Sequence, residues 1–157
     1  MDEVLLDTTY ILPIFGLKVD LKDFETIFPR LLDSLSVTFN PVALVESKWT
    51  VLRLARSAPS KKDILLEAYR VGLKTLKGDH RLKQTALTDE TIEETADKLL
   101  FQEGLKDYFD RLIYSTAAHM NCSLLTEDEE LHKIGGSSRF RRPRRVVNWQ
   151  KLAREVQ

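Results

Sequence analysis

The chain has 157 residues, 43% of them hydrophobic, which suits one folded domain over 1–157 and argues against disorder. Lysine plus arginine and aspartate plus glutamate number 24 each, so the near-zero net charge does not by itself indicate a nucleic-acid binder. The single cysteine, Cys122, excludes an internal disulfide and a cysteine-ligated zinc site.

Neither a membrane span nor a secretion signal is predicted. No apolar run approaches the roughly 20 residues that a spanning helix needs. The sequence starts Met1-Asp2-Glu3 and lacks the basic region of a signal peptide. We therefore expect a cytoplasmic protein without membrane association.

The apolar residues recur with strand and helix periods in alternating segments. In chain order the pattern predicts strand 3–6, helices 8–15 and 21–35, strand 37–39, helices 42–59 and 61–77, strand 83–87, helices 89–103 and 107–120, strand 123–126, helix 127–134, strand 145–148 and helix 149–156. Such alternation favours parallel βαβ units. The expected fold is a three-layer α/β/α sandwich with a mostly parallel sheet of four or five strands.

Local signals predict several helix ends. Asn40 before Pro41 is a strong helix start, and Thr88 is the expected cap of the helix that follows it. The pair Gly135-Gly136 is expected to end the helix over 127–134. Cys122 and the two tryptophans, Trp49 and Trp149, are expected in the core, and the three histidines match no metal spacing.

Four carboxylates stand at or near helix starts, and two of them come at the ends of apolar strands. They are Asp7, Glu46, Asp110 and Asp128. Ligands of open α/β sheets bind beyond the carboxyl ends of the strands. Four acids that converge there repel one another unless a divalent cation neutralises them. The pattern therefore suggests a Mg²⁺- or Mn²⁺-dependent phosphodiesterase, since these ions prefer oxygen ligands.

Each acid also has an ordinary structural explanation. Asp7, Asp110 and Asp128 could each cap a helix, or could be stabilised by the positive end of the helix dipole. Glu46 is harder to explain in this way, because it lies on or beside the apolar stripe of its helix. Its structural alternative is a buried salt bridge, for example to an arginine.

The order of these contexts resembles the PIN domain, the nuclease fold of VapC-type toxins and related RNA endonucleases. The similar segments are Leu5-Leu6-Asp7-Thr8-Thr9, Val45-Glu46, Asp110-Arg111-Leu112-Ile113-Tyr114-Ser115-Thr116-Ala117 and Leu124-Leu125-Thr126-Glu127-Asp128. The resemblance as a whole covers about residues 3 to 150. Glu127 departs from the basic or small residue common at that position, and an extra acid there would alter metal occupancy or the approach of phosphate.

The resemblance implies that Asp7, Glu46, Asp110 and Asp128 are catalytic and hold one or two divalent cations. Thr8 or Thr126 would then orient a carboxylate or a water. The implied activity is a metal-dependent endoribonuclease with an RNA substrate, and the toxin of a toxin–antitoxin pair would have an antitoxin partner. A homodimer is a further possible assembly. Two alternatives stay open: a catalytically weak PIN-like module that binds RNA or protein, and an RNA-processing nuclease without an antitoxin.

Two basic stretches could contact RNA phosphates, because arginine binds phosphate bidentately. The first holds Arg139, Arg141, Arg142, Arg144 and Arg145, and the second lies within 70–83. A solvated loop or a surface for an acidic partner chain explains the first stretch equally well.

Overall fold

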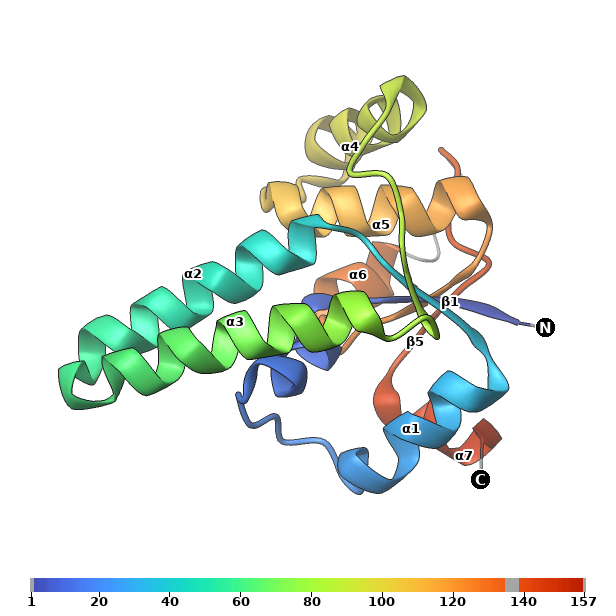
Figure 1. Cartoon of the computed structure of the whole chain (residues 1–157). Coiled ribbons are helices and arrows are strands. Elements are labelled where there is room, and N and C mark those ends of the chain that lie inside the picture. Colours follow the sequence, from blue (N-terminus) through green and yellow to red (C-terminus); the bar gives the residue numbers. More distant parts are fainter. Residues whose placement is uncertain (1, 135–138, 157) are drawn as a thin grey trace.

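Five parallel strands form the centre of the computed structural model, which describes residues 2–134 and 139–156 (Figure 1). The strands are β1 (Glu3–Leu6), β2 (Ser36–Phe39), β3 (Leu82–Gln84), β4 (Ser123–Leu125) and β5 (Arg145–Val147). Their order in the sheet is β3-β2-β1-β4-β5, so β1 lies at the centre. Leu6 pairs with both Phe39 and Leu125, which keeps the carboxyl ends of the central strands level.

Helices cover both faces of the sheet. They are η1 (Thr8–Tyr10), η2 (Leu12–Phe15), α1 (Phe24–Ser34), α2 (Val42–Ser57), η3 (Pro59–Lys61), α3 (Lys62–Gly78), α4 (Glu90–Glu103), α5 (Tyr108–Met120), α6 (Glu129–Ile134) and α7 (Trp149–Val156). The parallel α/β/α fold predicted from the alternating pattern is therefore confirmed. None of the described helices is long and apolar enough to cross a membrane.

The alternation of β1 divides the core into two clusters. Val4 and Leu6 face the cluster built with α1, α3 and α7, whereas Leu5 faces the cluster built with α4, α5 and α6. All three side chains are fully buried. A strand buried on both faces reads as a continuous apolar run, which explains why β1 shows no polar alternation.

The helices α2 and α3 pack side by side and extend beyond the carboxyl edge of the sheet as a long hairpin (Figure 1). The helix α3 lies close against η2 at Gly72. A β-carbon at Gly72 would stand 2.4 Å from the carbonyl oxygen of Ile14, so only glycine allows this approach. The hairpin is thereby fixed beside the chain segment that follows β1.

Two local predictions differ from the structure. The segment 8–15 forms two 3₁₀ helices rather than one α-helix, because Pro13 interrupts helical hydrogen bonding and Gly16 ends the segment at φ +80°. The cap of α4 is Asp89, whose carboxylate accepts from the Ile92 N–H at 2.8 Å. Thr88 instead donates its hydroxyl to Glu93. The predicted stop at Gly135-Gly136 lies outside the described residues.

Candidate active site

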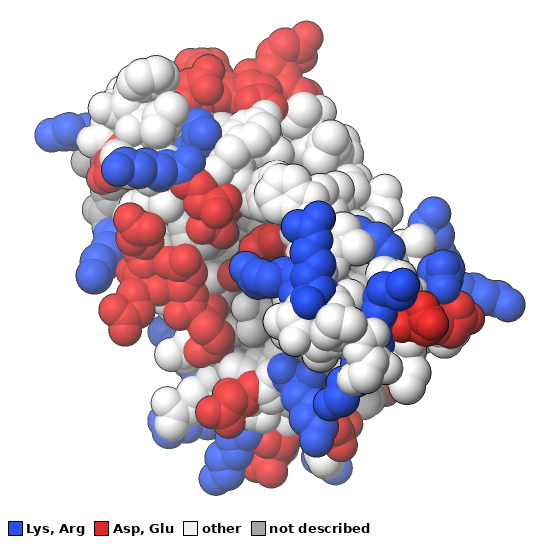
Figure 2. Space-filling model, turned by 90° about the vertical axis from the view of Figure 1, so that its left-hand side faces the viewer, with Lys and Arg blue, Asp and Glu red and all other residues white. Residues whose placement is uncertain are grey.

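The four predicted carboxylates line one cavity of about 300 Å³ beyond the carboxyl ends of β1 and β4. Asp7 directly follows β1, Glu46 and Asp110 lie early in α2 and α5, and Asp128 lies between β4 and α6. The cavity is also lined by Thr8, Thr9, Leu12, Thr50 and Asp107. Figure 2 looks onto this end of the molecule, where acidic and basic side chains gather in separate groups.

Asp7 is held rigidly at the bottom of the cavity. Its side chain is 7% exposed and accepts hydrogen bonds from the Thr8 N–H at 2.7 Å and the Thr126 hydroxyl at 2.6 Å. Burial raises the pKa of Asp7, although both hydrogen bonds oppose this rise. Burial makes the charged form of this carboxylate less stable, so a cation bound beside it would be stabilising.

Thr8 links Asp7 to Glu46. Its N–H binds Asp7, and its hydroxyl donates to Oε2 of Glu46 at 2.5 Å. The buried salt bridge considered for Glu46 is not present, because Glu46 forms no ion pair within 2–134 and 139–156. Burial raises the pKa of Glu46, and the charge of Asp7 adds to the rise.

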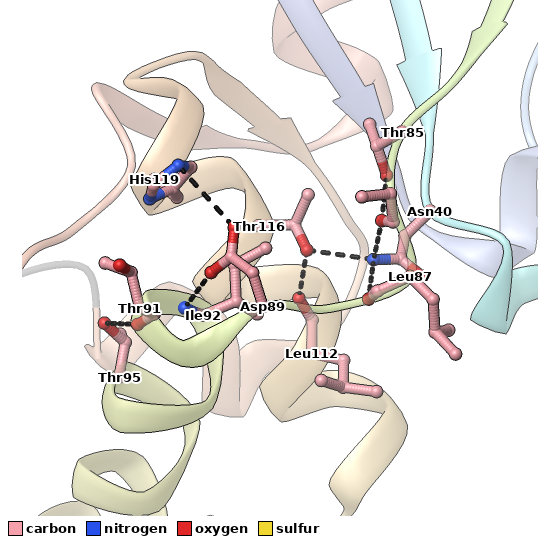
Figure 3. A network of polar contacts seen from close by, with 11 residues as sticks. Asn40, Thr85, Leu87, Asp89, Thr91, Ile92, Thr95, Leu112, Thr116 and His119 are labelled. Carbon is pink, nitrogen blue, oxygen red and sulfur yellow. Dashed lines mark hydrogen bonds and ion pairs between the residues drawn. The ribbon is translucent and has the colours of Figure 1, made fainter.

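A short polar network fixes the start of α2 and hence Glu46. The buried Asn40 accepts from the Val42 N–H at 2.8 Å and donates to Leu87 O and to the Thr116 hydroxyl, each at 2.9 Å. Figure 3 shows Asn40 between Leu87 and Thr116. The predicted helix start is confirmed, although Pro41 and not Asn40 occupies the cap position and α2 begins at Val42. The Asn40 side chain also ties α2 to α5.

Asp110 carries the clearest electrostatic signature of the site. Burial, together with the negative charges of Asp107, Asp7, Asp128 and Glu46, raises its pKa to about 8. Asp107 caps α5 by accepting a hydrogen bond from the Phe109 N–H at 2.8 Å. It also lines the cavity, so the site holds a fifth carboxylate. Asp107 is not among the site residues predicted from the sequence. Its position three residues before Asp110, at the same helix start, could have indicated that it faces the cavity.

Asp128 and Glu127 point in different directions. The Asp128 N–H donates to the Thr126 hydroxyl at 3.0 Å, and its carboxylate caps α6 by accepting from Glu130 N at 2.7 Å. Glu127 accepts from the hydroxyl of Tyr10 at 2.5 Å and from the N–H of Trp149 at 2.6 Å. Glu127 therefore joins η1 to the start of α7 and is not among the residues that line the acidic cavity.

The donor chemistry of the cavity fits a divalent cation. Carboxylate and hydroxyl oxygens are the ligands that Mg²⁺ and Mn²⁺ prefer. Among the residues that the structure describes, no three carboxylate, imidazole or thiol groups already stand in an arrangement that could hold one ion. An open acidic site is still compatible with Mg²⁺, because this ion commonly keeps several water ligands.

The arginines at the start of β5 lie far from this cavity. Arg145 pairs in register with Ser123, at the amino ends of the parallel strands, whereas Asp7 follows a carboxyl end. Arg144 forms an ion pair with Asp2 at 3.2 Å, and Arg145 forms one with Glu155 at 2.8 Å. The structure therefore brings the four acids together but leaves Arg144 and Arg145 at the opposite end of the sheet.

The fold and the site define an α/β protein with a carboxylate-lined cavity at the carboxyl edge of a parallel sheet. The family model described as PIN domain matches residues 4–137, and the chain belongs to the PIN domain family. PIN domains are nucleases, and they generally use divalent metal ions. The predicted family is thus confirmed.

Solved structures show the same fold at low sequence identity. VapBC2 from Rickettsia felis, bound to a promoter DNA fragment, matches with a TM-score of 0.62 and 19% identity over 94% of this chain and 98% of that chain. PAE2754 from Pyrobaculum aerophilum matches with 0.64 and 12% identity over 99% and 95%. VapBC-5 from Mycobacterium tuberculosis, a toxin–antitoxin system, matches with 0.52 and 18% identity over 94% and 98%. No curated protein matches the chain.

Proposed function

We propose that this PIN domain is a divalent-metal-dependent endoribonuclease that hydrolyses RNA phosphodiester bonds. The observation that carries the proposal is the gathering of Asp7, Glu46, Asp110 and Asp128 in one cavity from four separate parts of the chain. Burial, together with the negative charges of the neighbouring acids, raises the pKa values of Asp7, Glu46 and Asp110. A module that only binds a partner has no evident need for this arrangement.

The same four carboxylates would hold Mg²⁺ or Mn²⁺. Such ions, when bound, neutralise the phosphate, activate a water and stabilise the leaving oxygen. The threonines act on the carboxylates: Thr126 holds one oxygen of Asp7, and Thr8 binds both Asp7 and Glu46. One residue thus sets the distance between two ligands, which preserves the site before substrate arrives.

Cleavage assays with structured and unstructured RNA test this function. We expect hydrolysis with Mg²⁺ or Mn²⁺, its loss on addition of EDTA, and its recovery when excess metal is returned. Cleavage that persists at the full rate in EDTA would exclude metal dependence. The absence of cleavage with either metal would favour a catalytically weak binding module.

The role of toxin is a narrower proposal within this function. It is supported by the similarity in fold to VapBC2, to VapBC-5 and to a toxin–antitoxin complex from Klebsiella pneumoniae. A small protein encoded beside this chain that binds it and stops cleavage would assign the toxin role. An active nuclease without such a protein would instead be an RNA-processing enzyme. A homodimer can be tested in the same preparation by measuring the mass in solution.

The arginine run remains a proposed RNA contact. The informative variant keeps Arg144 and Arg145, which lie at the end of the sheet away from the cavity, and changes Arg139, Arg141 and Arg142 to Gln. If these three side chains contact single-stranded phosphates, the slope of log K against log salt should fall in magnitude by about 2. The matched control is Arg30→Gln with Arg154→Gln, two exposed arginines on α1 and α7. Equal slopes for all three proteins would assign the run to a partner or to solubility.

A further inference from the structure

Trp49 is not a core residue, contrary to the expectation from the sequence. Its side chain is 60% exposed on α2, one helical turn beyond Glu46. The ring contacts Phe109, with centroids 5.0 Å apart and planes inclined by 53°. Phe109 directly precedes Asp110, and Trp49 lies on the same helix as Glu46. The two aromatic rings therefore lie beside the acidic cavity, with Phe109 packed against Trp49.

A surface hollow of about 720 Å³ continues from this ring toward the end of α2. It is lined by Trp49, Leu52, Arg53, Arg56 and Ser57, which together we term the Trp49 surface. Thr50, the residue after Trp49, lines the acidic cavity, so the two hollows adjoin along one helix.

The charges along α2 are strongly unequal. Its single acidic residue is Glu46, whereas Lys48, Arg53 and Arg56 are basic. Lys48 lies over the ring of Tyr69 at 4.7 Å. Arg53 and Arg56 form no ion pair with any residue in the described parts of the chain, which leaves both guanidinium groups available to an anion. Basic side chains gather beside the acidic ones at this end of the molecule (Figure 2).

We infer that the Trp49 surface binds single-stranded RNA next to the cleaved bond, with one base stacked on Trp49 and phosphates on Arg53 and Arg56. This inference rests on the proposed nuclease function and adds a substrate class to it. Stacking on an exposed indole needs an unpaired base, which excludes a continuous duplex at this position.

Charge is the reason to choose nucleic acid over an apolar protein partner. An acidic cavity repels a polyanion, so nearby cations are needed to guide the substrate toward it. Arg53 and Arg56 lie about 10 Å and 15 Å from Glu46 along the helix axis. Those distances suit the phosphates of a few nucleotides that lead away from the cavity. An aromatic ring interleaved with arginines is the usual composition of a single-strand binding surface.

Tryptophan fluorescence offers a direct test, because the two tryptophans differ in exposure. Trp149 is 3% exposed and donates its ring N–H to Lys22 O at 2.8 Å, so it should not respond to a ligand at α2. In the Asp7→Asn background, in which cleavage should be slow, unstructured RNA should quench the emission saturably. The same sequence as a blunt duplex should quench much less. Trp49→Phe should abolish the quenching while Trp149 still emits.

Affinity for a dye-labelled strand provides the second readout. Trp49→Ala should weaken binding about 10-fold, in the range of base stacking measured by alanine substitution, and Trp49→Phe should restore most of it. Arg53→Gln with Arg56→Gln should weaken binding and lower the salt slope. The matched control is Phe101→Ala, which removes an aromatic ring that is 83% exposed on α4.

Two results would overturn the inference: emission that stays constant while labelled RNA binds, and equal affinities of the Trp49→Ala and Phe101→Ala variants. Either result would leave the Trp49 surface to a protein partner. The nuclease proposal is tested separately by cleavage with the unaltered chain. Cleavage without a Trp49 effect overturns only this inference. Stacking without any metal-dependent cleavage overturns the nuclease function and leaves Trp49 in a surface that binds single strands but cleaves nothing.

Discussion

Replacing Asp7 with Asn should lower RNA cleavage at least about 100-fold, because the substitution removes a proposed metal ligand and its charge. The shape of the side chain is kept. The Asn oxygen can still accept from the Thr8 N–H, and its amide can donate to the Thr126 hydroxyl that now donates to Asp7. Folding should therefore survive, and the loss of one negative charge should relieve repulsion in the cavity. The measurement is the initial rate at saturating Mg²⁺ on a short RNA.

The control for this variant is Asp20→Asn, which makes the same chemical change at an exposed position that does not line the acidic cavity. It should cleave at the rate of the unaltered chain. Thermal unfolding of both variants separates lost chemistry from lost structure. Full activity in Asp7→Asn would contradict the proposed site, whatever the stability.

Replacing Asp110 with Asn should stabilise the metal-free protein at pH 8 and flatten its dependence on pH. Burial and the neighbouring acids raise the pKa of Asp110 from 3.8 to about 8. The folded state therefore holds this proton more tightly than the unfolded state does. The stability that the protonated group contributes is complete below about pH 4 and is lost as the pH rises through about 8.

Asn has no charge to lose, so the variant should be more stable at pH 8 by about 2 kcal/mol, once solvent screening of a half-buried group is considered. For a domain of this size, that corresponds to an increase in melting temperature of roughly 4–8 °C. Asp7 and Glu46 also have raised pKa values and remain in the variant, so part of the pH dependence should remain.

Melting curves between pH 5 and 8, in EDTA and in Mg²⁺, provide the measurement. Divalent metal should stabilise the unaltered chain, increasingly so toward pH 8, and should stabilise Asp110→Asn less. Asp20→Asn should follow the unaltered chain at every pH. Parallel pH curves for Asp110→Asn and the unaltered chain would show that the acids around Asp110 do not repel it as the structure indicates.

The sequence alone was sufficient to predict the central architecture, because the relevant signals are local. Val4, Leu5 and Leu6 form an unbroken apolar run, which is typical of a short strand that is buried on both faces. Once such strands are parallel, residues at their carboxyl ends meet at one edge of the sheet. That rule is sufficient to predict that Asp7 and Asp128 lie close together.

Helical periodicity shows which side chains share a face of a helix, but not which residues pack against them. Only the tertiary structure supplies those contacts. The pattern of α2 places Trp49 near its apolar residues but cannot tell whether anything covers the ring. In the structure the ring contacts Phe109, and the side chain stays 60% exposed. Glu46 shows the same ambiguity, because its spacing allowed a salt bridge or a site. The Thr8 hydroxyl, 38 residues earlier in the chain, is its actual partner.

Position along the sheet was likewise decided only by the fold. Arg145 belongs to β5, the strand next to β4, and β4 leads into the site at Asp128. Parallel pairing places the start of that strand opposite Ser123, at the end of the sheet away from Asp7. Glu127 stands next to Asp128, yet it turns toward Tyr10 and Trp149. Residue types and spacing specify which groups can react, whereas the direction of a side chain depends on partners that are distant in sequence.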